Sequence, residues 1–181
     1  MRVITGTAKG RRLVTPDGKD VTRPTGEKVK EALFSAIQFY IEEADVLDLF
    51  AGSGQLGIEA LSRGAKTAVF VDTSKEAQKC ISENIKTCGF ADRTRVKTTD
   101  ATLYLSGAME RFDLAFLDPP YAAEQLPVVL PLVSKVMRQG GRVFCETSKE
   151  IDLPETVGQL TKCKEYRYGR TKVVSYVKDE E

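Results

Sequence analysis

The sequence contains no histidine, so it lacks both the commonest metal ligand and the commonest general base of enzymes. Its four cysteines are scattered and do not form the C-x-x-C spacing that is typical of zinc sites. These two absences effectively exclude zinc chemistry and Ser-His catalytic triads. We therefore expect no metal site.

Long apolar segments are also missing. The chain has no run of 18 apolar residues and no basic and then apolar leader, so we expect neither a membrane span nor a signal peptide, and a cytoplasmic protein. Its 181 residues, of which 41% are hydrophobic, fit one globular domain with a small N-terminal extension. The expected division is an extension over residues 1–24 and a domain over residues 25–181.

Charge is unevenly distributed along the chain. The net charge is +1, but residues 1–30 contain eight Lys or Arg against three acids, an excess of +5 that leaves −4 for residues 31–181. A basic segment suits a polyanion such as nucleic acid, although a solvated basic tail has the same composition. The candidate phosphate contacts are Arg2, Lys9, Arg11, Arg12, Arg23 and Lys28. We expect cofactor binding to be independent of this segment.

Residues 45–57 predict a buried strand, a glycine-rich turn and the start of a helix. Gly52, Gly54 and Gly57 have the G-x-G-x-x-G spacing, which lets a backbone turn tightly, approach a ligand and pack the helix on the strand. A second predicted strand ends at Asp72, which follows Gly54 by 18 positions. This is close to the roughly 20 positions expected for a carboxylate that binds ribose hydroxyls. The turn and Asp72 together therefore predict a nucleotide-cofactor site. The glycine spacing by itself is also compatible with a strand–helix turn that binds no ligand.

Asp48 distinguishes between two cofactors that this pattern suits, NAD and S-adenosylmethionine. It stands four residues before Gly52, at the tip of the predicted first strand. A carboxylate there would repel a pyrophosphate but attract the ammonium group on the methionine end of S-adenosylmethionine. We therefore favour S-adenosylmethionine. The alternative for Asp48 is an acid that only accepts hydrogen bonds from the turn amides.

The order of the predicted elements indicates the fold class. Strands and helices alternate from residue 45 to residue 147, which predicts an α/β fold with a parallel, doubly wound sheet. Residues 160–167 and 171–178 have no helix between them, so they should add antiparallel strands to this sheet. Residues 1–15 predict a small basic β-hairpin.

Helix ends are also marked in the sequence. The first helix is expected to begin at Thr25, and Lys30 stands outside its apolar stripe. A later helix, over residues 74–88, is expected to begin with a capping box formed by Thr73 and Glu76.

The segment Asp118-Pro119-Pro120-Tyr121 follows the predicted fourth strand of the wound sheet, so Asp118 should emerge in the same crevice as the glycine turn. Prolines lack an N–H group and are stiff, so they hold their carbonyl oxygens as fixed acceptors. If Asp118 and the Pro119 carbonyl each accept one hydrogen of an exocyclic amine, the nitrogen lone pair is freed to attack. Tyr121 can stack on the base, a contact worth roughly 1–3 kcal/mol. The alternative is a proline turn that only ends a strand.

The D-P-P-Y motif at 118–121, together with D-L-F-A-G-S-G at 48–54, resembles the amino-methylating class of S-adenosylmethionine-dependent nucleic-acid methyltransferases, which share a seven-stranded Rossmann-like fold. Residues 2–13, 23–34 and 56–64 make the chain closely similar to the bacterial RsmD family. The resemblance spans nearly the whole chain. It implies methylation of the 2-amino group of one guanine in 16S ribosomal RNA, within a small ribosomal subunit or its assembly intermediate.

The resemblance also implies a role for each site residue. The residues expected to face the methionine portion of the cofactor are Asp48, Ala51, Gly52 and Gly54. Asp72 should bind the ribose, Asp100 and Ala101 the adenine, and residues 118–121 the target amine. Many members of the family have Glu where Asp72 stands, which leaves the geometry of ribose binding open.

Three alternatives stay open. The D-P-P-Y motif also suits a DNA methyltransferase that acts on the 6-amino group of adenine, although the chain has no room for the separate target-recognition domain that such enzymes often carry. An NAD-dependent oxidoreductase is disfavoured by Asp48 and by the absence of histidine. The third alternative is a noncatalytic RNA-binding module that retains the fold.

Overall fold

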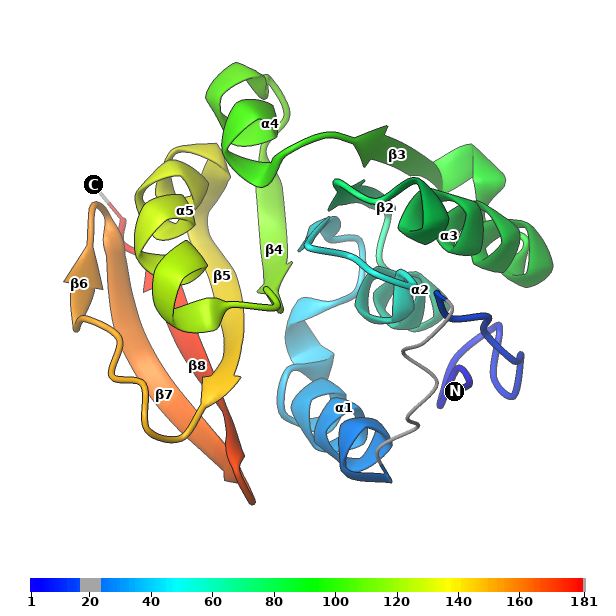
Figure 1. Ribbon diagram of the computed structural model, residues 1–181, viewed down its shortest axis with the longest axis horizontal. Helices are drawn as coiled ribbons and strands as arrows, with labels where there is room; N and C mark the ends of the chain where they lie inside the picture. The colour runs from blue at the N-terminus through cyan, green and yellow to red at the C-terminus, as the bar shows by residue number, and fades with distance from the viewer. Residues whose placement is uncertain (17–23, 181) are drawn as a thin grey trace.

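The computed structural model describes residues 1–16 and 24–180 as a mixed sheet flanked by helices (Figure 1). The strands are β1 (Asp45–Leu49), β2 (Thr67–Asp72), β3 (Thr94–Thr98), β4 (Phe112–Leu117), β5 (Met137–Ser148), β6 (Thr156–Val157), β7 (Leu160–Tyr168) and β8 (Thr171–Lys178). The helices are α1 (Pro24–Ala36), α2 (Gln55–Ser62), α3 (Lys75–Cys88), α4 (Ala101–Gly107) and α5 (Ala122–Val136), with two 3-10 turns, η1 (Gln38–Tyr40) and η2 (Ala91–Arg93). None of these helices is long and apolar enough to cross a membrane.

The strand order in the sheet is β3-β2-β1-β4-β5-β8-β7-β6. The neighbours from β3 to β5 are parallel, whereas β8 is antiparallel to both β5 and β7. This confirms the α/β doubly wound fold and the antiparallel C-terminal strands. The sheet has eight strands rather than the expected seven, because the two-residue β6 pairs with β7. Two residues are too few to show the alternation by which a strand is recognised in a sequence.

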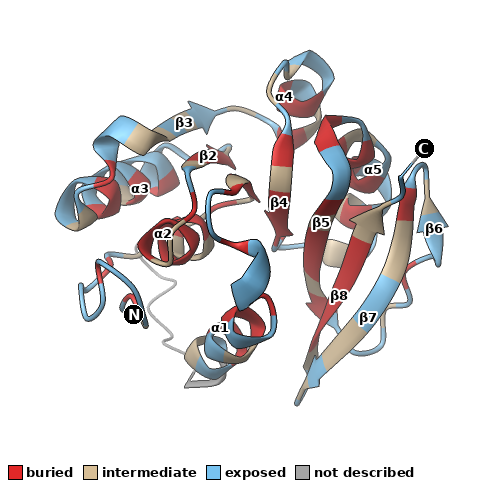
Figure 2. Cartoon of the chain, turned by 180° about the vertical axis from the view of Figure 1, so that it is seen from behind, coloured by how far each residue is buried: buried red, intermediate tan, exposed pale blue. Residues whose placement is uncertain are grey.

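Successive residues of the central strands enter two different hydrophobic cores. In β1, Val46 belongs to the core that contains residues of α1, α2 and α3, and Leu47 belongs to the core that contains residues of α4 and α5. Figures 1 and 2 show the buried central strands running between these two groups of helices. The period of two in a strand explains the division. Burial on both faces explains why these strands are almost continuously apolar in sequence.

The N-terminal segment, residues 1–16, is not a regular β-hairpin, and it packs into the core of the domain. Its two arms are joined by a single antiparallel bridge, between Arg2 and Arg12, rather than by two strands. Three of its side chains are buried in the same core as α1, α2 and α3: Val3, Ala8 and Leu13. At Gly6 (φ +88°) an added Cβ atom would lie 1.7 Å from the carbonyl oxygen of Ser62, so only glycine fits this contact with α2.

Two helix starts differ from the sequence prediction. Helix α1 begins at Pro24, one residue before the expected cap. Helix α3 is capped by Ser74, whose side chain accepts a hydrogen bond from the Ala77 amide, and not by a capping box at Thr73. In the preceding turn, Asp72 accepts a hydrogen bond from the Ser74 N–H, and the helix starts one residue later than expected.

Candidate active site

A cavity of about 600 Å³ lies at the carboxyl ends of the parallel strands, where α/β sheets bind their ligands. It collects residues from the turns that follow β1, β2, β3 and β4. The sequence-predicted residues in its wall are Ala51, Gly52, Asp72, Asp100, Ala101, Asp118, Pro119 and Pro120. Of the residues predicted to bind the cofactor or the target amine, three do not line it: Asp48, Gly54 and Tyr121. We call this cavity the cleft.

The glycine turn after β1 has the backbone that its sequence predicts. Gly52 and Gly54 have φ angles of +58° and +76°, in the left-handed region that favours glycine. A Cβ atom at Gly57 would lie 2.4 Å from the Phe70 ring, so the third glycine is needed for α2 to pack on β2. Phe50 has a φ of +65° and lines the cleft. A non-glycine residue in this region is strained, and such residues cluster at ligand sites.

Asp72 holds two turns of the cleft together. Its Oδ2 accepts a hydrogen bond from the Gly52 amide at 2.9 Å, and its Oδ1 accepts one from the Ser74 amide at 2.9 Å. An ionised carboxylate offers about four lone-pair positions, so these two bonds leave acceptor capacity for ribose hydroxyls. Asp72 therefore both shapes the cleft and forms part of its wall.

Asp48 lies beneath the glycine turn, with 2% of its surface exposed. Its Oδ2 accepts a hydrogen bond from the Gly57 amide at 2.9 Å, which corresponds to the alternative of an acid bonded to turn amides. Burial, together with the nearby Asp118 and Asp72 carboxylates, raises the pKa of Asp48 to about 8 against this bond. The carboxyl ends of β1, β2 and β4 thus gather three carboxyl groups, of which the buried Asp48 retains its proton near neutral pH.

Asp100 is the N-cap of α4. Its Oδ1 accepts hydrogen bonds from the Thr102 amide at 2.8 Å and the Leu103 amide at 3.1 Å, and also from the Thr102 hydroxyl. The bonds to the Thr102 side chain and the Leu103 amide lower the pKa of Asp100, because they favour its ionised form. The cap fixes an ionised carboxylate at the start of α4. Asp100 follows β3 and Asp118 follows β4, so the two residues lie on opposite sides of the cleft.

The D-P-P-Y segment leaves β4 at the cleft and leads into α5. Asp118 and Pro120 are exposed, Pro119 is buried, and all three line the cleft. Tyr121 is the residue before α5, and its side chain is 69% exposed. Its backbone N–H donates to Oε1 of Gln125 at 3.1 Å, which holds the turn. An exposed ring beside the cleft suits stacking on a base.

The N-terminal segment forms part of the cleft, which the sequence did not predict. Met1, Thr15 and Pro16 line the cavity. The segment is held there by the buried amide of Asn84, which accepts a hydrogen bond from the Val14 amide at 2.8 Å and donates to the Val14 carbonyl at 2.9 Å. The same amide donates to the carbonyl of Ser53, in the glycine turn, at 2.9 Å. Spacing along α3 marks Asn84 only as a polar residue among apolar ones.

A buried glutamate attaches the N-terminal segment to α2. Glu59 is fully buried and accepts hydrogen bonds from the Ile4 amide at 2.9 Å and the Thr5 amide at 3.1 Å. It also forms an ion pair with Arg63, at 2.9 Å, one turn later in the helix. These partners satisfy a charge that would otherwise be very unfavourable in the interior.

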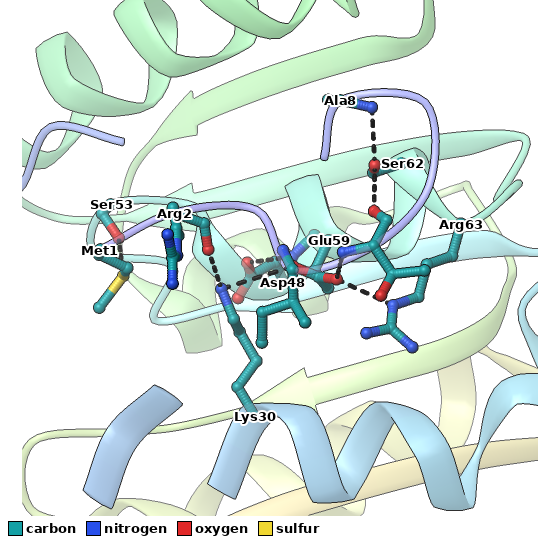
Figure 3. Close-up of polar contacts among 12 residues, drawn as sticks. Met1, Arg2, Ala8, Lys30, Asp48, Ser53, Glu59, Ser62 and Arg63 are labelled. Atoms are coloured by element: carbon teal, nitrogen blue, oxygen red, sulfur yellow. Dashed lines mark hydrogen bonds and ion pairs between the residues drawn. The ribbon is translucent and has the colours of Figure 1, made fainter. Parts of the chain in front are cut away.

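Lys30 completes this network from α1. Its Nζ lies 3.5 Å from Oε2 of Glu59 and donates to the Arg2 carbonyl at 2.9 Å (Figure 3). Burial lowers the pKa of Lys30, and the Glu59 carboxylate opposes that effect. A lysine outside the apolar stripe of a helix normally faces solvent; here the N-terminal segment covers it, so Lys30 is only 2% exposed.

The predicted nucleic-acid contacts are partly brought together. A groove of about 500 Å³ between the N-terminal segment and α1 is lined by Arg2, Lys9 and Lys28, with Glu27 and Glu31 beside them. We call it the basic groove. Arg11 and Arg12 are exposed but lie outside its wall, and Arg23 lies outside the described residues.

Comparison with known proteins identifies relatives over almost the whole chain. A family model described as conserved hypothetical protein 95 matches residues 1–177. The chain is 42% identical to "Putative rRNA methyltransferase YlbH" of Bacillus subtilis, over 98% of this chain and 99% of that protein. It is 34% identical to "Ribosomal RNA small subunit methyltransferase D" of Haemophilus influenzae, over 83% of this chain and 80% of that protein.

Solved structures share the same architecture. "Putative methyltransferase yhhF from Escherichia coli" superposes with a TM-score of 0.87 at 28% identity and covers 100% of this chain and 99% of that one. A more distant neighbour, magnesium protoporphyrin IX methyltransferase from Synechocystis with bound S-adenosylmethionine, is 11% identical with a TM-score of 0.67, over 87% of this chain and 81% of that one. At that identity the likeness shows the shared fold.

Proposed function

The chain belongs to the RsmD family, and from this membership we propose that it transfers the methyl group of S-adenosylmethionine to the 2-amino group of a guanine in 16S ribosomal RNA. The observation that carries the proposal is the cleft itself. The glycine turn, Asp72 and the Asp118-Pro119-Pro120 segment, which are far apart in the sequence, line one cavity. The residues proposed to bind the cofactor and the two proposed acceptors for the amine therefore line the same cavity.

The cleft suits S-adenosylmethionine in size and charge. Its volume of about 600 Å³ lies within the range of small-molecule sites. Asp72 and Asp118 line it, so the local field favours a cationic ligand over a pyrophosphate. This supports S-adenosylmethionine over NAD. When bound, the cofactor supplies an electrophilic methyl group on a positively charged sulfur.

The chain's own residues hold the amine. Asp118 and the Pro119 carbonyl accept its two hydrogens, and Pro120 contributes no competing donor because it has no N–H. Two fixed acceptors bias the nitrogen toward a tetrahedral shape and expose its lone pair. Once the nitrogen carries the methyl group it becomes acidic, so it can lose a proton to Asp118 or water without a strong base. Tyr121 stacks on the extruded base.

The basic N-terminal segment positions the RNA. Arg2, Lys9 and Lys28 line the basic groove and provide phosphate contacts, which orient a nucleic acid without reading its sequence. Arg11, Arg12 and Arg23 extend the same basic charge in the sequence. The cleft must then select the guanine. Because the Haemophilus relative is named for the small ribosomal subunit, we propose 16S RNA in that subunit or its assembly intermediate as the partner.

The function is tested by methyl transfer to small subunits that were made in cells lacking this protein. Mass mapping of the RNA should find one additional methyl group on a guanine, at a position that stays unmodified without the enzyme. A methyl group on adenine, or transfer to DNA and not to RNA, would favour the DNA methyltransferase alternative. Binding of S-adenosylhomocysteine without any transfer would favour the noncatalytic module.

The docking surface is tested by the double variant Arg11→Glu with Arg12→Glu. Each lost phosphate contact should reduce the slope of log affinity for RNA against log salt by about 0.7 to 0.9. The matched control is Arg111→Glu with Lys135→Glu, two exposed residues at the start of β4 and the end of α5. If the first variant keeps the slope of the parent protein, Arg11 and Arg12 are not phosphate contacts, and this part of the proposed docking surface is wrong.

A further inference from the structure

Gln55 carries an unsatisfied polar atom in the wall of the cleft. It is the first residue of α2, directly after Gly54, and it lines the cavity. Its side-chain oxygen Oε1 is buried and has no hydrogen-bond partner among the described residues. A buried acceptor without a donor costs about 1–3 kcal/mol, and native proteins rarely retain one without a reason.

Gln55 differs in position from the other residues that have a buried side-chain oxygen without a hydrogen-bond partner. The part of the chain that the structure describes contains two further buried side-chain oxygens without a partner, in Tyr104 and Thr147. Neither residue lines the cleft. Of these three residues, Gln55 is therefore the one placed in the wall of the cleft, where rotation of its side chain can present the oxygen to a ligand.

The surroundings of Gln55 define the chemistry of that ligand group. Asp72 and Asp118 line the same cavity, and both raise the pKa of the buried Asp48 beneath it. Carboxylates and an amide oxygen are all acceptors, so the complementary group is rich in N–H donors and positively charged. An ammonium group, with three donors and one charge, meets both conditions.

Sheet topology selects the end of the cofactor. In the strand order β3-β2-β1-β4, Gln55 follows β1, beside β4 and Asp118, whereas Asp100 follows β3 two strands away. If Asp72 takes the ribose and Asp100 the adenine, the amino-acid end of the cofactor lies on the side of Gln55. Resting on the proposed function, we propose that Gln55 binds the cofactor's α-ammonium group through Oε1.

The test compares two ligands and three variants. S-adenosylhomocysteine carries the amino-acid portion, and 5′-methylthioadenosine is a related thioether without it. By calorimetry, Gln55→Met should weaken S-adenosylhomocysteine binding about tenfold, the loss of one hydrogen bond to a charged group, and change 5′-methylthioadenosine binding less than about twofold. Gln55→Glu retains an acceptor and should bind S-adenosylhomocysteine at least as tightly as the parent. Gln78→Met, on the exposed face of α3, is the control and should change neither affinity.

Thermal unfolding adds a measurement that distinguishes binding from a structural role. Because Gln55→Met removes a buried unsatisfied acceptor, the ligand-free variant should melt at the same temperature as the parent or higher, but gain less on adding S-adenosylhomocysteine. A lower melting temperature without ligand, or equal losses for both ligands, would overturn the assignment of Gln55. If the parent protein binds neither ligand, the proposed function fails, and this inference with it.

Discussion

The two ends of the parallel sheet carry the same side chain, aspartate, in opposite electrostatic settings. At the amino ends of β1 and β4, Asp45 and Asp113 share Arg138, whose guanidinium lies 2.9 Å from one and 2.7 Å from the other. At the carboxyl ends of β1 and β2, Asp48 and Asp72 have no Lys or Arg partner within 4.0 Å among the described residues. They accept hydrogen bonds from backbone N–H groups instead.

The pKa values follow this difference. Although burial raises the pKa of Asp45, its hydrogen bonds from Thr67 and Arg138 hold it below the usual range. Burial, with a smaller effect of the Asp118 and Asp72 carboxylates, raises the pKa of Asp48 to about 8. Asp45 and Asp48 stand only three residues apart in one strand. The paired arginine keeps Asp45 ionised, whereas burial beside other carboxylates favours the protonated form of Asp48.

The largest effect is expected at Asp118, on the ligand side of this comparison. Asp118→Ala should lower turnover by about 100-fold or more, because one preorganised acceptor for the amine is lost, and should leave cofactor affinity nearly unchanged. Single-turnover methyl transfer and calorimetry with S-adenosylhomocysteine measure the two effects separately. Parallel losses of affinity and turnover would contradict this role.

Asp72 should affect binding rather than turnover. Asp72→Ala should weaken S-adenosylmethionine binding by about one to two orders of magnitude, because charge-assisted hydrogen bonds to the ribose are worth roughly 1.5–3 kcal/mol each. Asp72 also accepts from the Gly52 and Ser74 amides, so Asp72→Asn, which retains one acceptor, should lose less. Unchanged affinity in a folded Asp72→Ala protein would remove this residue from the site.

Asp48 should make stability depend on pH. Its pKa of about 8 in the folded protein exceeds the value of about 4 in an unfolded chain, so folding retains a proton that unfolding releases. The free energy of unfolding should therefore fall by about 1–2 kcal/mol between pH 6 and pH 8, and less in Asp48→Asn. Urea unfolding at both pH values measures it. Equal falls in both proteins would show that Asp48 is already ionised at pH 6.

The smallest effect is expected at the amino ends. Arg138→Leu leaves Asp45 and Asp113 without their cation and should lower the free energy of unfolding by about 1 kcal/mol, because this arginine is partly exposed and solvent screens the pair. Affinity for S-adenosylhomocysteine should not change, because Arg138 is not in the wall of the cleft. A loss of affinity would show that the two ends of the sheet are coupled.

Local patterns predicted the centre of the molecule closely. Strand β2 ends at Asp72 as predicted, and the left-handed glycines of the turn after β1 stand where their spacing places them. Eight of the predicted site residues share one cavity. These features depend on short-range chemistry, since a strand's period, a glycine's φ and a proline's missing N–H are all set within a few residues.

Contacts made by the N-terminal segment were not predictable in the same way. Lys30 is charged and outside an apolar stripe, yet it is buried because residues 1–16 cover it and Glu59 neutralises it. Asn84 and Gln55 are ordinary polar residues in their helices. Asn84 joins the N-terminal segment to the glycine turn, and Gln55, in the wall of the cleft, has a side-chain oxygen without a hydrogen-bond partner among the described residues. No local pattern encodes partners that lie between 28 and 70 residues away along the chain.

By itself, the sequence determined the α/β class, the glycine turn, and which strands end in acids, because each depends on residue type and spacing along the chain. Only the tertiary structure decided which of those acids pair with Arg138 and which line the cleft. It also decided that the basic segment forms part of the wall of the cleft. The physical reason is that burial and pairing are properties of three-dimensional neighbours, and these set the charge state and the free acceptors on which binding depends.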